Sequence, residues 1–521
     1  MDRDYYLARA QEYRPKLEES LTGPACRVNI SRQGEKVWVE EIEGDVWPAP
    51  LGRSDQVIWD FGDHHVGYVT LSLGSTGSPQ DAPAFFRLRF LERPTEALED
   101  SADYDGWISR SWFQEEVFHV DVLPYRLALP RRYAFRYLEL TVLDTSKKWK
   151  LTVEDISLRS VSSATGEVPV IDGAALLQKL GLREGEDAAK RAALLERIDK
   201  IGLRTLHSCM QDVFEDGPKR DRRLWSGDLH LQAITSYETF RNDALVLRCL
   251  YLFAGLTRED GRVSACLFTE PRPLGDDTYL FDYSLFFISI LYRHFEKTGD
   301  LKVLRELLPV ALRQIELLRA FFDENGLLTE EAAGRCFVDW KAGLHKQASG
   351  QAIYIYALRQ ALSLCRAASE EEAAQFVQGE LSQKEAAALR LWDEEKGVFV
   401  SGSERQVSLA SQVWMILAGV VSPSKGKDIL SAVSSLSPLG MSTPYMNHFY
   451  VEALLLCGLT REAIEHVEEY WGGMAREGAD TFWEIYDPDN PQESPYGSTL
   501  ITSACHAWSC TPSYFFRRLL S

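Results

Sequence analysis

The order of hydrophobic and polar residues divides the chain into a β-like part and a helical part. From Arg27 to about Ser160, β-branched and aromatic residues come in short runs, often alternating with polar ones, and turn-forming residues separate the runs. This pattern predicts strands at Val37–Val39, Val57–Phe61, Tyr68–Leu73, Phe86–Phe90 and Tyr133–Val142. Many short strands with turns between them favour a β-sandwich. The acidic, turn-rich stretch Pro94–Gly106 is expected to be a loop.

Beyond Ser160 the periodicity becomes helical and stays so to the C-terminus. Predicted helices lie at Ala188–Met210, Leu231–Phe253, Tyr283–Lys297, Lys302–Phe322, Ala348–Ala368, Gln406–Val421, Pro444–Leu455 and Thr460–Gly472. Such a series of helical hairpins fits a bundle, a solenoid or a closed double ring, and periodicity does not choose among them. With the linker Ser162–Gly166, the pattern predicts two domains: residues 1–165, with a leading amphipathic helix over 4–20, and residues 166–521.

Composition narrows the class of protein. The formal net charge of -20 repels phosphate backbones, so nucleic acid is not an expected partner. No apolar run is long enough to cross a membrane, and the N-terminus lacks the features of a signal peptide. The 9 Cys have no C-x-x-C spacing, which favours reduced thiols and a cytoplasmic location. The sequence is compatible with a monomer and with a homo-oligomer.

A loop dense in charge interrupts the helical part between Phe214 and Asp228. Gly217-Pro218 forbids a continuous helix there. The segment holds four carboxylates, three arginines, one lysine and Trp225. Most charge clusters are solvated, salt-bridged connections, but an aromatic residue suits a sugar platform better than a solvated loop. Composition alone therefore leaves both interpretations open.

A second segment, Gly478–Asp487, places Glu484 among aromatic residues. An aromatic ring stacks on the apolar face of a pyranose, although a core cluster with a Glu at its edge is the simpler interpretation of this segment alone. Taken together, the two segments supply the pair of carboxylates that glycoside hydrolysis needs, one as acid and one as base or nucleophile. The sequence holds no nucleotide-binding loop, zinc motif or serine nucleophile elbow, so we expect no metal and no cofactor.

These segments resemble the inverting alpha-L-rhamnosidase family of glycoside hydrolases. The family's acidic motif reads D-C-P-x-R-(D)E-R, followed by an aromatic residue, a small residue, Gly and Asp. The similar segments are Asp216–Arg222 with Trp225–Asp228 for that motif, Phe482-Trp483-Glu484 for its W-E motif, Phe337–Trp340 for its G-D-W segment, and Asp60–Gly62 with Gly67–Val69 for its D-F-G and G-Y-V strands. The resemblance covers most of the chain from about Val37 onward, and the order of the motifs is specific.

The resemblance implies an N-terminal β-sandwich followed by an (α/α)6 helical barrel with the site at one mouth. It implies removal of a terminal alpha-L-rhamnose, or a related deoxyhexose, from a small carbohydrate with inversion. Asp221 corresponds to the family's general acid and Glu484 to its general base. The residues that would bind or shape the sugar pocket are Asp216, Arg220, Trp225, Asp228, Asp339, Trp340, Trp483 and His506.

The sequence departs from the family's pattern in three places. Asp221 stands where the family commonly has Glu, and the shorter side chain would set the proton donor back by about 1.5 Å. Asp216 or Glu215 is therefore an alternative donor. Gly217 replaces the usual Cys, and the chain ends at Ser521, which leaves no room for the family's usual C-terminal β-sandwich. Three alternatives stay open: a glycosidase of the same fold with another sugar specificity, a catalytically silent carbohydrate-binding protein, and a helical scaffold with no sugar site, in which Trp225 and Trp483 would lie far apart.

Overall fold

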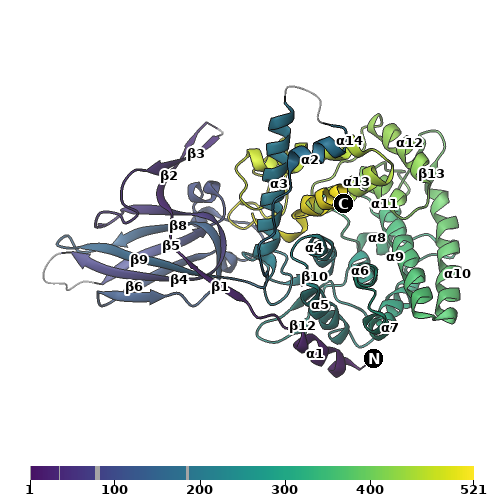
Figure 1. Ribbon diagram of the computed structural model, residues 1–521, viewed down its shortest axis with the longest axis horizontal. Coiled ribbons are helices and arrows are strands. Elements are labelled where there is room, and N and C mark those ends of the chain that lie inside the picture. Colours follow the sequence, from purple (N-terminus) through teal and green to yellow (C-terminus); the bar gives the residue numbers. More distant parts are fainter. Residues whose placement is uncertain (1, 35, 77–82, 183–186) are drawn as a thin grey trace.

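The computed structural model describes residues 2–34, 36–76, 83–182 and 187–521. The strands of the β region gather at one end of the molecule and the long helices of the helical region at the other (Figure 1). The change between them falls between β9 (Lys150–Ser162) and α2 (Gly173–Lys179), close to the change of pattern in the sequence. A β-sheet N-terminal region followed by a helical region is thus confirmed.

The β region is organised around one long strand, β4 (Gln56–Thr76). Its first part pairs with β2 (Cys26–Gln33) and β8 (Tyr133–Asp144), and its second part pairs mainly with β7 (Tyr125–Ala128) and β9. Sequence analysis predicted two strands here, because Gly62 looked like a separator. Instead the register shifts between Asp60 and His65 within one strand, and Gly62 has a φ of 81°, which glycine adopts without strain.

The other strands complete the same sheet. They are β1 (Glu18–Thr22) beside β9, β3 (Lys36–Ile42) beside β2, β5 (Ala84–Leu91) beside β8, and β6 (Glu115–Val120) beside β5. Trp59, Phe86, Phe90 and Phe135 are fully buried in one apolar core of the β region. Burying each side chain of this size contributes about 1.5–3 kcal/mol, so this core accounts for much of the stability of the β region.

The helical region consists largely of antiparallel hairpins. Its long helices are α3 (Ala188–Cys209), α4 (Ser226–Glu238), α5 (Asp243–Gly255), α6 (Phe281–Thr298), α7 (Leu301–Leu318), α9 (Gln347–Ala368), α10 (Glu371–Ala388), α11 (Leu409–Leu417), α12 (Pro423–Ser434), α13 (Pro444–Leu456), α14 (Thr460–Arg476) and α15 (Pro512–Leu520). The single helix predicted over Leu231–Phe253 is two helices, α4 and α5. The break occurs because Arg241 has a φ of 55° and the Asn242 side chain caps α5 by accepting from the Leu245 N–H.

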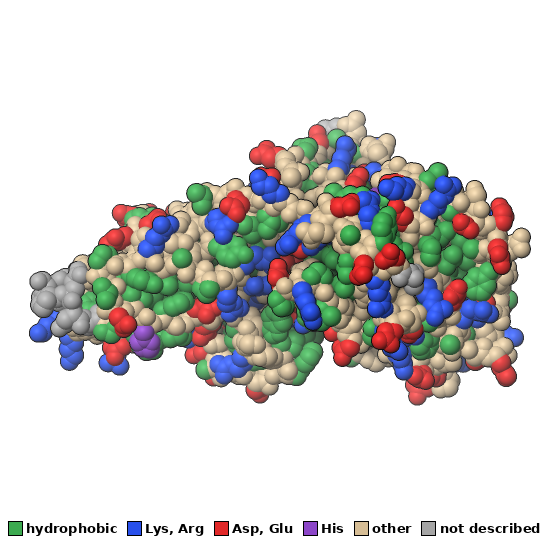
Figure 2. Space-filling view, turned by 90° about the horizontal axis from the view of Figure 1, so that it is seen from below, with side chains coloured by type: hydrophobic (Ala, Val, Ile, Leu, Met, Phe, Trp, Pro, Cys, Tyr) green, Lys and Arg blue, Asp and Glu red, His purple; other side chains and the backbone are tan. Residues whose placement is uncertain are grey.

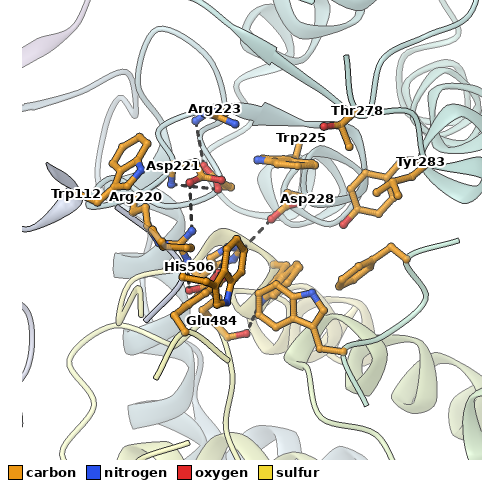
Figure 3. Close-up of a pocket in the computed structure, with 18 of the residues that line it drawn as sticks. Trp112, Arg220, Asp221, Arg223, Trp225, Asp228, Thr278, Tyr283, Glu484 and His506 are labelled. Atoms are coloured by element: carbon orange, nitrogen blue, oxygen red, sulfur yellow. Dashed lines mark hydrogen bonds and ion pairs between the residues drawn. The ribbon is translucent and has the colours of Figure 1, made fainter. Parts of the chain in front are cut away.

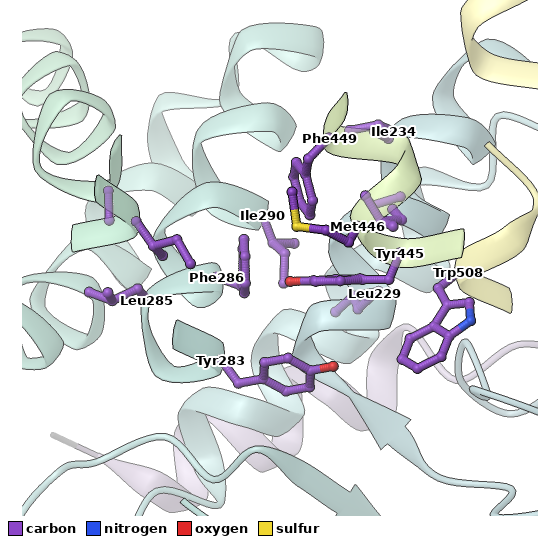
Figure 4. Close-up of a cluster of buried hydrophobic side chains, with 14 of the residues drawn as sticks. Leu229, Ile234, Tyr283, Leu285, Phe286, Ile290, Tyr445, Met446, Phe449 and Trp508 are labelled. Carbon is purple, nitrogen blue, oxygen red and sulfur yellow. The ribbon is translucent and has the colours of Figure 1, made fainter. Parts of the chain in front are cut away.

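Side chains from several hairpins meet in one apolar core. α4 contacts α6, α6 contacts α9, α9 contacts α11, and α11 contacts α13. The short 3-10 helix η6 (Ala507–Ser509) contacts both α4 and α13. Tyr283 and Phe286 of α6, Tyr445 and Phe449 of α13, and Leu229 of α4 converge in this core (Figure 4). The contacts therefore run from α4 through the hairpins and back toward α4.

The leading helix is shorter than predicted. α1 (Arg3–Glu12) ends before Pro15, which cannot continue a helix, and it packs against α5 of the helical region. In the described parts of the chain, no helix has the length and apolar character needed to span a membrane. All nine cysteines lie among the described residues, and each is free. Acidic and basic side chains are interspersed on the face shown in Figure 2.

Candidate active site

A cavity of about 590 Å³ lies where a loop of the β region meets the helical region. This volume is within the range of small-molecule sites. Of the ten site residues predicted from the sequence, the cavity is lined by Asp216, Arg220, Asp221, Trp225, Asp228, Trp340, Glu484 and His506. Figure 3 shows the acidic loop on one side and Glu484 with His506 on the other. The fold therefore joins the two charged segments that are far apart in the sequence.

The acidic loop is held in shape by Asp216. Its two carboxylate oxygens face the backbone N–H groups of Arg223, at 3.0 Å, and Asp221, at 3.4 Å. Its own carbonyl oxygen accepts a hydrogen bond of 2.7 Å from the Ala507 N–H. The loop then enters β10 (Leu224–Trp225), which pairs with β11 (Cys266–Phe268), and Asp228 lies in the first turn of α4. These contacts fix the positions of the loop carboxylates in the cavity wall.

Glu484 is buried and surrounded by hydrogen-bond donors. Nη2 of Arg220 lies 2.8 Å from each carboxylate oxygen, the Tyr496 hydroxyl donates to Oε1 at 2.7 Å, and the Ser503 N–H donates to Oε2 at 3.0 Å. Burial alone would raise the pKa of Glu484, but the charge of Arg220 and these hydrogen bonds hold it below its usual value. Glu484 is therefore the carboxylate that stays ionised.

The acids of the loop have the opposite tendency. Burial, followed by the charge of nearby Asp221, raises the pKa of Asp216 to about 8. Burial, followed by the charge of Asp216, also raises the pKa of Asp228 well above its usual range. The cavity thus combines an ionised carboxylate with protonated ones, the separation of pKa values that acid and base roles require.

Three residues that line the cavity, Arg223, Asp228 and His506, each carry a buried polar side-chain atom without a hydrogen bond among the described residues. Among the described residues, Oδ1 of Asp228 and Nδ1 of His506 make no hydrogen bond, although they lie 3.6 Å apart. Burial lowers the pKa of His506 to about 4, so its imidazole is neutral near pH 7. Buried polar atoms are normally hydrogen-bonded, and those of Asp228 and His506 are positioned to bind the hydroxyl groups of a ligand.

Three further candidates have structural partners elsewhere. Glu215, an alternative proton donor, receives two hydrogen bonds from Arg132, at 2.7 and 2.8 Å, and is not among the residues that line the cavity. Asp339 is not among the residues that line the cavity, and it accepts hydrogen bonds from the backbone N–H groups of Ser442 and Thr443, just before α13. Trp483 lines a separate cavity, and the Arg93 guanidinium lies 3.7 Å from its ring centroid.

Comparison with protein families assigns the chain. The bacterial alpha-L-rhamnosidase six-hairpin glycosidase domain matches residues 191–520, which is more than half of the chain. The N-terminal domain of glycosyl hydrolase family 78 alpha-rhamnosidases matches residues 30–160. The chain belongs to the bacterial alpha-L-rhamnosidase family. It is therefore a six-hairpin glycosidase.

Solved structures agree with this assignment. A rhamnosidase from Klebsiella oxytoca with rhamnose bound is 43% identical, with a TM-score of 0.91 over 99% of this chain and 98% of that chain. A family 78 rhamnosidase of Bacillus sp. GL1 is 22% identical, with a TM-score of 0.72 over 91% of this chain and 47% of that one. The Streptomyces avermitilis alpha-L-rhamnosidase complexed with L-rhamnose is 15% identical, with a TM-score of 0.67 over 96% and 44%. The last two share the fold. No curated protein matches the chain.

Several residues of the glycosidase pocket were not predicted from the sequence. Aromatic side chains of the helical region that line it are Tyr283, Phe337, Tyr496 and Trp508, and the β region adds Trp107, Ile108, Ser109 and Trp112. Trp508 lies two residues after His506, which was itself a predicted site residue, so the sequence did point to the segment that contains Trp508. Trp107 and Trp112 follow the stretch Pro94–Gly106, which is acidic and rich in turns, and nothing in the local sequence indicates that they reach the cavity.

A buried charge network connects the β region to the site. Lys219, only 2% exposed, lies next to Arg220, and its Nζ is 3.0 Å from Oε2 of Glu96 and 3.7 Å from Oε2 of Glu92. The same Glu92 oxygen accepts a hydrogen bond of 2.7 Å from the Ala504 N–H, next to the Ser503 N–H that binds Glu484. Two carboxylates of the β region thereby contact segments on both sides of the cavity.

Proposed function

We propose that this glycosidase removes terminal alpha-L-rhamnose from small glycosides with inversion of the anomeric centre. Asp221 is the general acid and Glu484 the general base. The observation that carries the proposal is that both carboxylates line one cavity and share one guanidinium group. Nη1 of Arg220 lies 3.1 Å from Asp221 Oδ1, and its Nη2 lies 2.8 Å from Glu484. An inverting site needs roughly 6.5–9.5 Å between its two carboxyl groups, which leaves room for the attacking water.

The reaction is one concerted displacement. Asp221 transfers its proton to the glycosidic oxygen as the bond from that oxygen to the anomeric carbon breaks. A water molecule attacks the anomeric carbon from the opposite face and gives a proton to Glu484. The products are the free sugar with inverted configuration and the leaving alcohol, and the two carboxyl groups exchange protons with solvent before the next turnover.

Glu484 must make room for that water. Its two oxygens have about four acceptor positions, and four donor contacts from Arg220, Tyr496 and Ser503 occupy them. The Tyr496 hydroxyl is the one of these donors that can rotate about its own bond. In this proposal Tyr496 turns its hydrogen away and accepts a hydrogen bond from the attacking water, while Arg220 keeps Glu484 ionised.

The sugar is held by two of the polar atoms that lack partners. Asp228 and His506 bind ring hydroxyls through Oδ1 and Nδ1, which satisfies both buried atoms. Trp225 and Trp340 form apolar walls, and Asp216 holds the acidic loop against the sugar. Asp216 also has a raised pKa, but both of its oxygens already face backbone N–H groups, so we assign proton transfer to Asp221.

Proton NMR of the first turnover tests this function. With 4-nitrophenyl alpha-L-rhamnoside, the β-anomer of rhamnose is expected to appear before mutarotation mixes the anomers. Glu484→Gln should abolish this signal while rhamnose still binds. Release of the α-anomer would overturn inversion. Turnover of another glycoside in place of the rhamnoside would overturn the sugar assignment, and binding without any turnover would identify a silent binding protein.

We propose a closed architecture for the chain. The helical contacts that run from α4 to α13 and return through η6 support an (α/α)6 barrel. The two parts of the sheet on either side of one core support a β-sandwich. We place the boundary between the two domains at 165/166, in the segment between β9 and α2. A crystal structure in which α4 and α13 lie on opposite ends of an open array would contradict the barrel.

A further inference from the structure

The loop of residues 104–113 brings the β region into the pocket. It includes the 3-10 helix η3 (Arg110–Trp112) and ends just before β6. Trp107, Ile108, Ser109 and Trp112 of this loop line the same cavity as Asp221 and Glu484. The wall that they contribute is largely apolar, because Ser109 is its one hydroxyl side chain and that hydroxyl lies 2.8 Å from the Ser111 hydroxyl.

This loop is packed firmly onto the helical region. Phe113 belongs to a small apolar cluster with Tyr496, Leu500 and Ile501. A Cβ at Gly106 would lie 2.2 Å from the Tyr496 carbonyl oxygen, so only glycine allows this close approach. The ring centroids of Trp107 and Tyr496 are 5.8 Å apart. The loop is therefore a fixed wall of the pocket and not a distant surface element.

Trp107 nevertheless presents most of its surface to solvent. It is 78% exposed, while Trp112, Tyr496 and Trp340 around it are at least partly buried. Because Trp107 lines the cavity, its exposed indole ring is available to contact a ligand there. Its position next to Tyr496, which holds Glu484, points to a ligand of the same site.

The different exposure of Asp221 and Glu484 indicates which end of the substrate contacts Trp107, Ile108 and Trp112. The side chain of Asp221 is 20% exposed, whereas that of Glu484 is only 4% exposed. The cavity therefore opens toward Asp221. Because the general acid must touch the leaving oxygen, the leaving group lies on this open side. Figure 3 shows Trp112 on the side of Asp221 and Arg220, away from Tyr283.

We propose that Trp107, Ile108 and Trp112 form the leaving-group subsite and that it selects planar, uncharged aromatic alcohols. This inference rests on the proposed function, since it describes the other half of the same substrate. Two indole rings and an isoleucine provide flat apolar surface for an aryl ring. A sugar leaving group would need several hydrogen-bond partners for its hydroxyls. The polar side-chain groups of this wall are the Ser109 hydroxyl and two indole N–H groups, and that of Trp107 already donates to the Pro495 carbonyl oxygen.

Steady-state kinetics on three rhamnosides test the inference. The substrates are 4-nitrophenyl alpha-L-rhamnoside, methyl alpha-L-rhamnoside and a disaccharide of rhamnose linked to glucose. For Trp107→Ala and Trp112→Ala, the ratio of kcat/KM for the aryl over the methyl substrate should fall about tenfold relative to the unmodified enzyme. Because both substrates carry the same rhamnose, this ratio does not change when a substitution affects only the binding of the sugar. Trp107→Phe should restore most of the ratio, because it keeps an aromatic face.

The matched control is Trp38→Ala. Trp38 is also an exposed tryptophan of the β region, at 47%, but it lines the separate cavity beside Trp483. Its removal should leave the aryl-to-methyl ratio within twofold. An unchanged ratio in both loop variants overturns the inference. An equal fall for the disaccharide and the aryl substrate overturns the assignment to aromatic leaving groups.

Calorimetric binding separates failure of the subsite from failure of the proposed function. If the unmodified protein hydrolyses no rhamnoside, the proposed function fails, while the subsite still predicts a binding difference. The aryl rhamnoside should then bind at least tenfold more tightly than the methyl rhamnoside, and Trp107→Ala should remove this preference. Equal affinities for the two ligands in the unmodified protein would overturn the subsite.

Discussion

Nη2 of Arg220 lies 2.8 Å from both carboxylate oxygens of Glu484, and the two side chains are almost completely buried. A buried carboxylate without a partner takes up a proton, because low-dielectric surroundings disfavour its charge. Arg220 reverses this tendency and keeps Glu484 ionised. The same guanidinium contacts Asp221, so one side chain links the proposed base to the proposed acid.

Replacing Arg220 should shift the pH profile. Arg220→Gln removes the charge that lowers the pKa of Glu484, so burial dominates and this pKa rises. A base acts only when ionised, and activity is lost as the pH falls through its pKa. The acid limb of the kcat/KM profile should therefore move to higher pH. Arg313→Gln, which removes an arginine paired with Glu316 on the surface, should leave the limb in place.

Glu484→Gln tests the base directly. The amide cannot accept the proton from water, so kcat should fall by about 10²–10⁴-fold, the usual contribution of a positioned general base. Rhamnose binding, measured by calorimetry, should persist, because Asp228 and His506 still face the sugar. Retention of more than a tenth of the activity would mean that another group is the base.

Leaving-group chemistry identifies the acid. Asp221→Asn should lower kcat/KM for methyl alpha-L-rhamnoside by about 10²–10⁴-fold. The loss should be much smaller for 4-nitrophenyl alpha-L-rhamnoside, because its phenol leaves with little need of a proton. If Asp216→Asn shows this pattern and Asp221→Asn does not, Asp216 is the donor.

Asp216 should make stability depend on pH. Its pKa is about 8 in the folded protein and 3.8 ordinarily, so the folded state holds a proton that the unfolded state has lost between these values. The free energy of unfolding therefore decreases as the pH rises through this window. Asp216→Asn cannot ionise, and its Tm relative to the unmodified protein should improve from pH 5 to pH 8. Parallel pH dependence of the two Tm values would contradict the raised pKa.

Removing the buried lysine should be costly. Lys219→Met leaves Glu96 buried without its cation and Glu92 with His64 alone, which should lower the free energy of unfolding by about 3–5 kcal/mol in denaturant titrations. Lys190→Met is the control, because the pair of Lys190 with Asp187 is exposed and contributes about 0–1 kcal/mol. Similar losses for both variants would show that the buried network adds no stability.

The sequence identified the segments that contain the candidate catalytic residues, but it did not identify the residues that contact those segments in the fold. The motif around Asp221 and the aromatic strip around Glu484 do meet in one cavity, and the β-to-helical change near Ser162 is where the pattern placed it. The roles of these residues stay predictions until they are measured. The helical periodicity also missed α10. The strand pattern divided β4 into two strands, because a local pattern does not show that a strand continues through a bend.

Two of the predicted site residues, Asp339 and Trp483, do not line the cavity, and the physical reason is the same for both. Asp339 and Trp483 match family segments in type and order, yet Asp339 accepts hydrogen bonds at the start of α13 and Trp483 stacks with Arg93. A motif gives the type of a residue, whereas the side to which it points is decided by packing against distant segments. The loop with Trp107 shows the same limit, since nothing local indicates that it reaches a helical domain.

The contacts of Lys219 with the β region make it difficult to separate the helical region from the rest of the chain. Its ammonium group finds its two carboxylate partners, Glu92 and Glu96, across the border with the strands, and one of them also steadies the backbone beside Glu484. A truncated protein that keeps only the helical hairpins would lose Glu92 and Glu96. Lys219 and the backbone beside Glu484 would then lack the contacts that hold them in place. Grafting this hairpin array onto another protein would require the host to supply equivalent acids at the same two points.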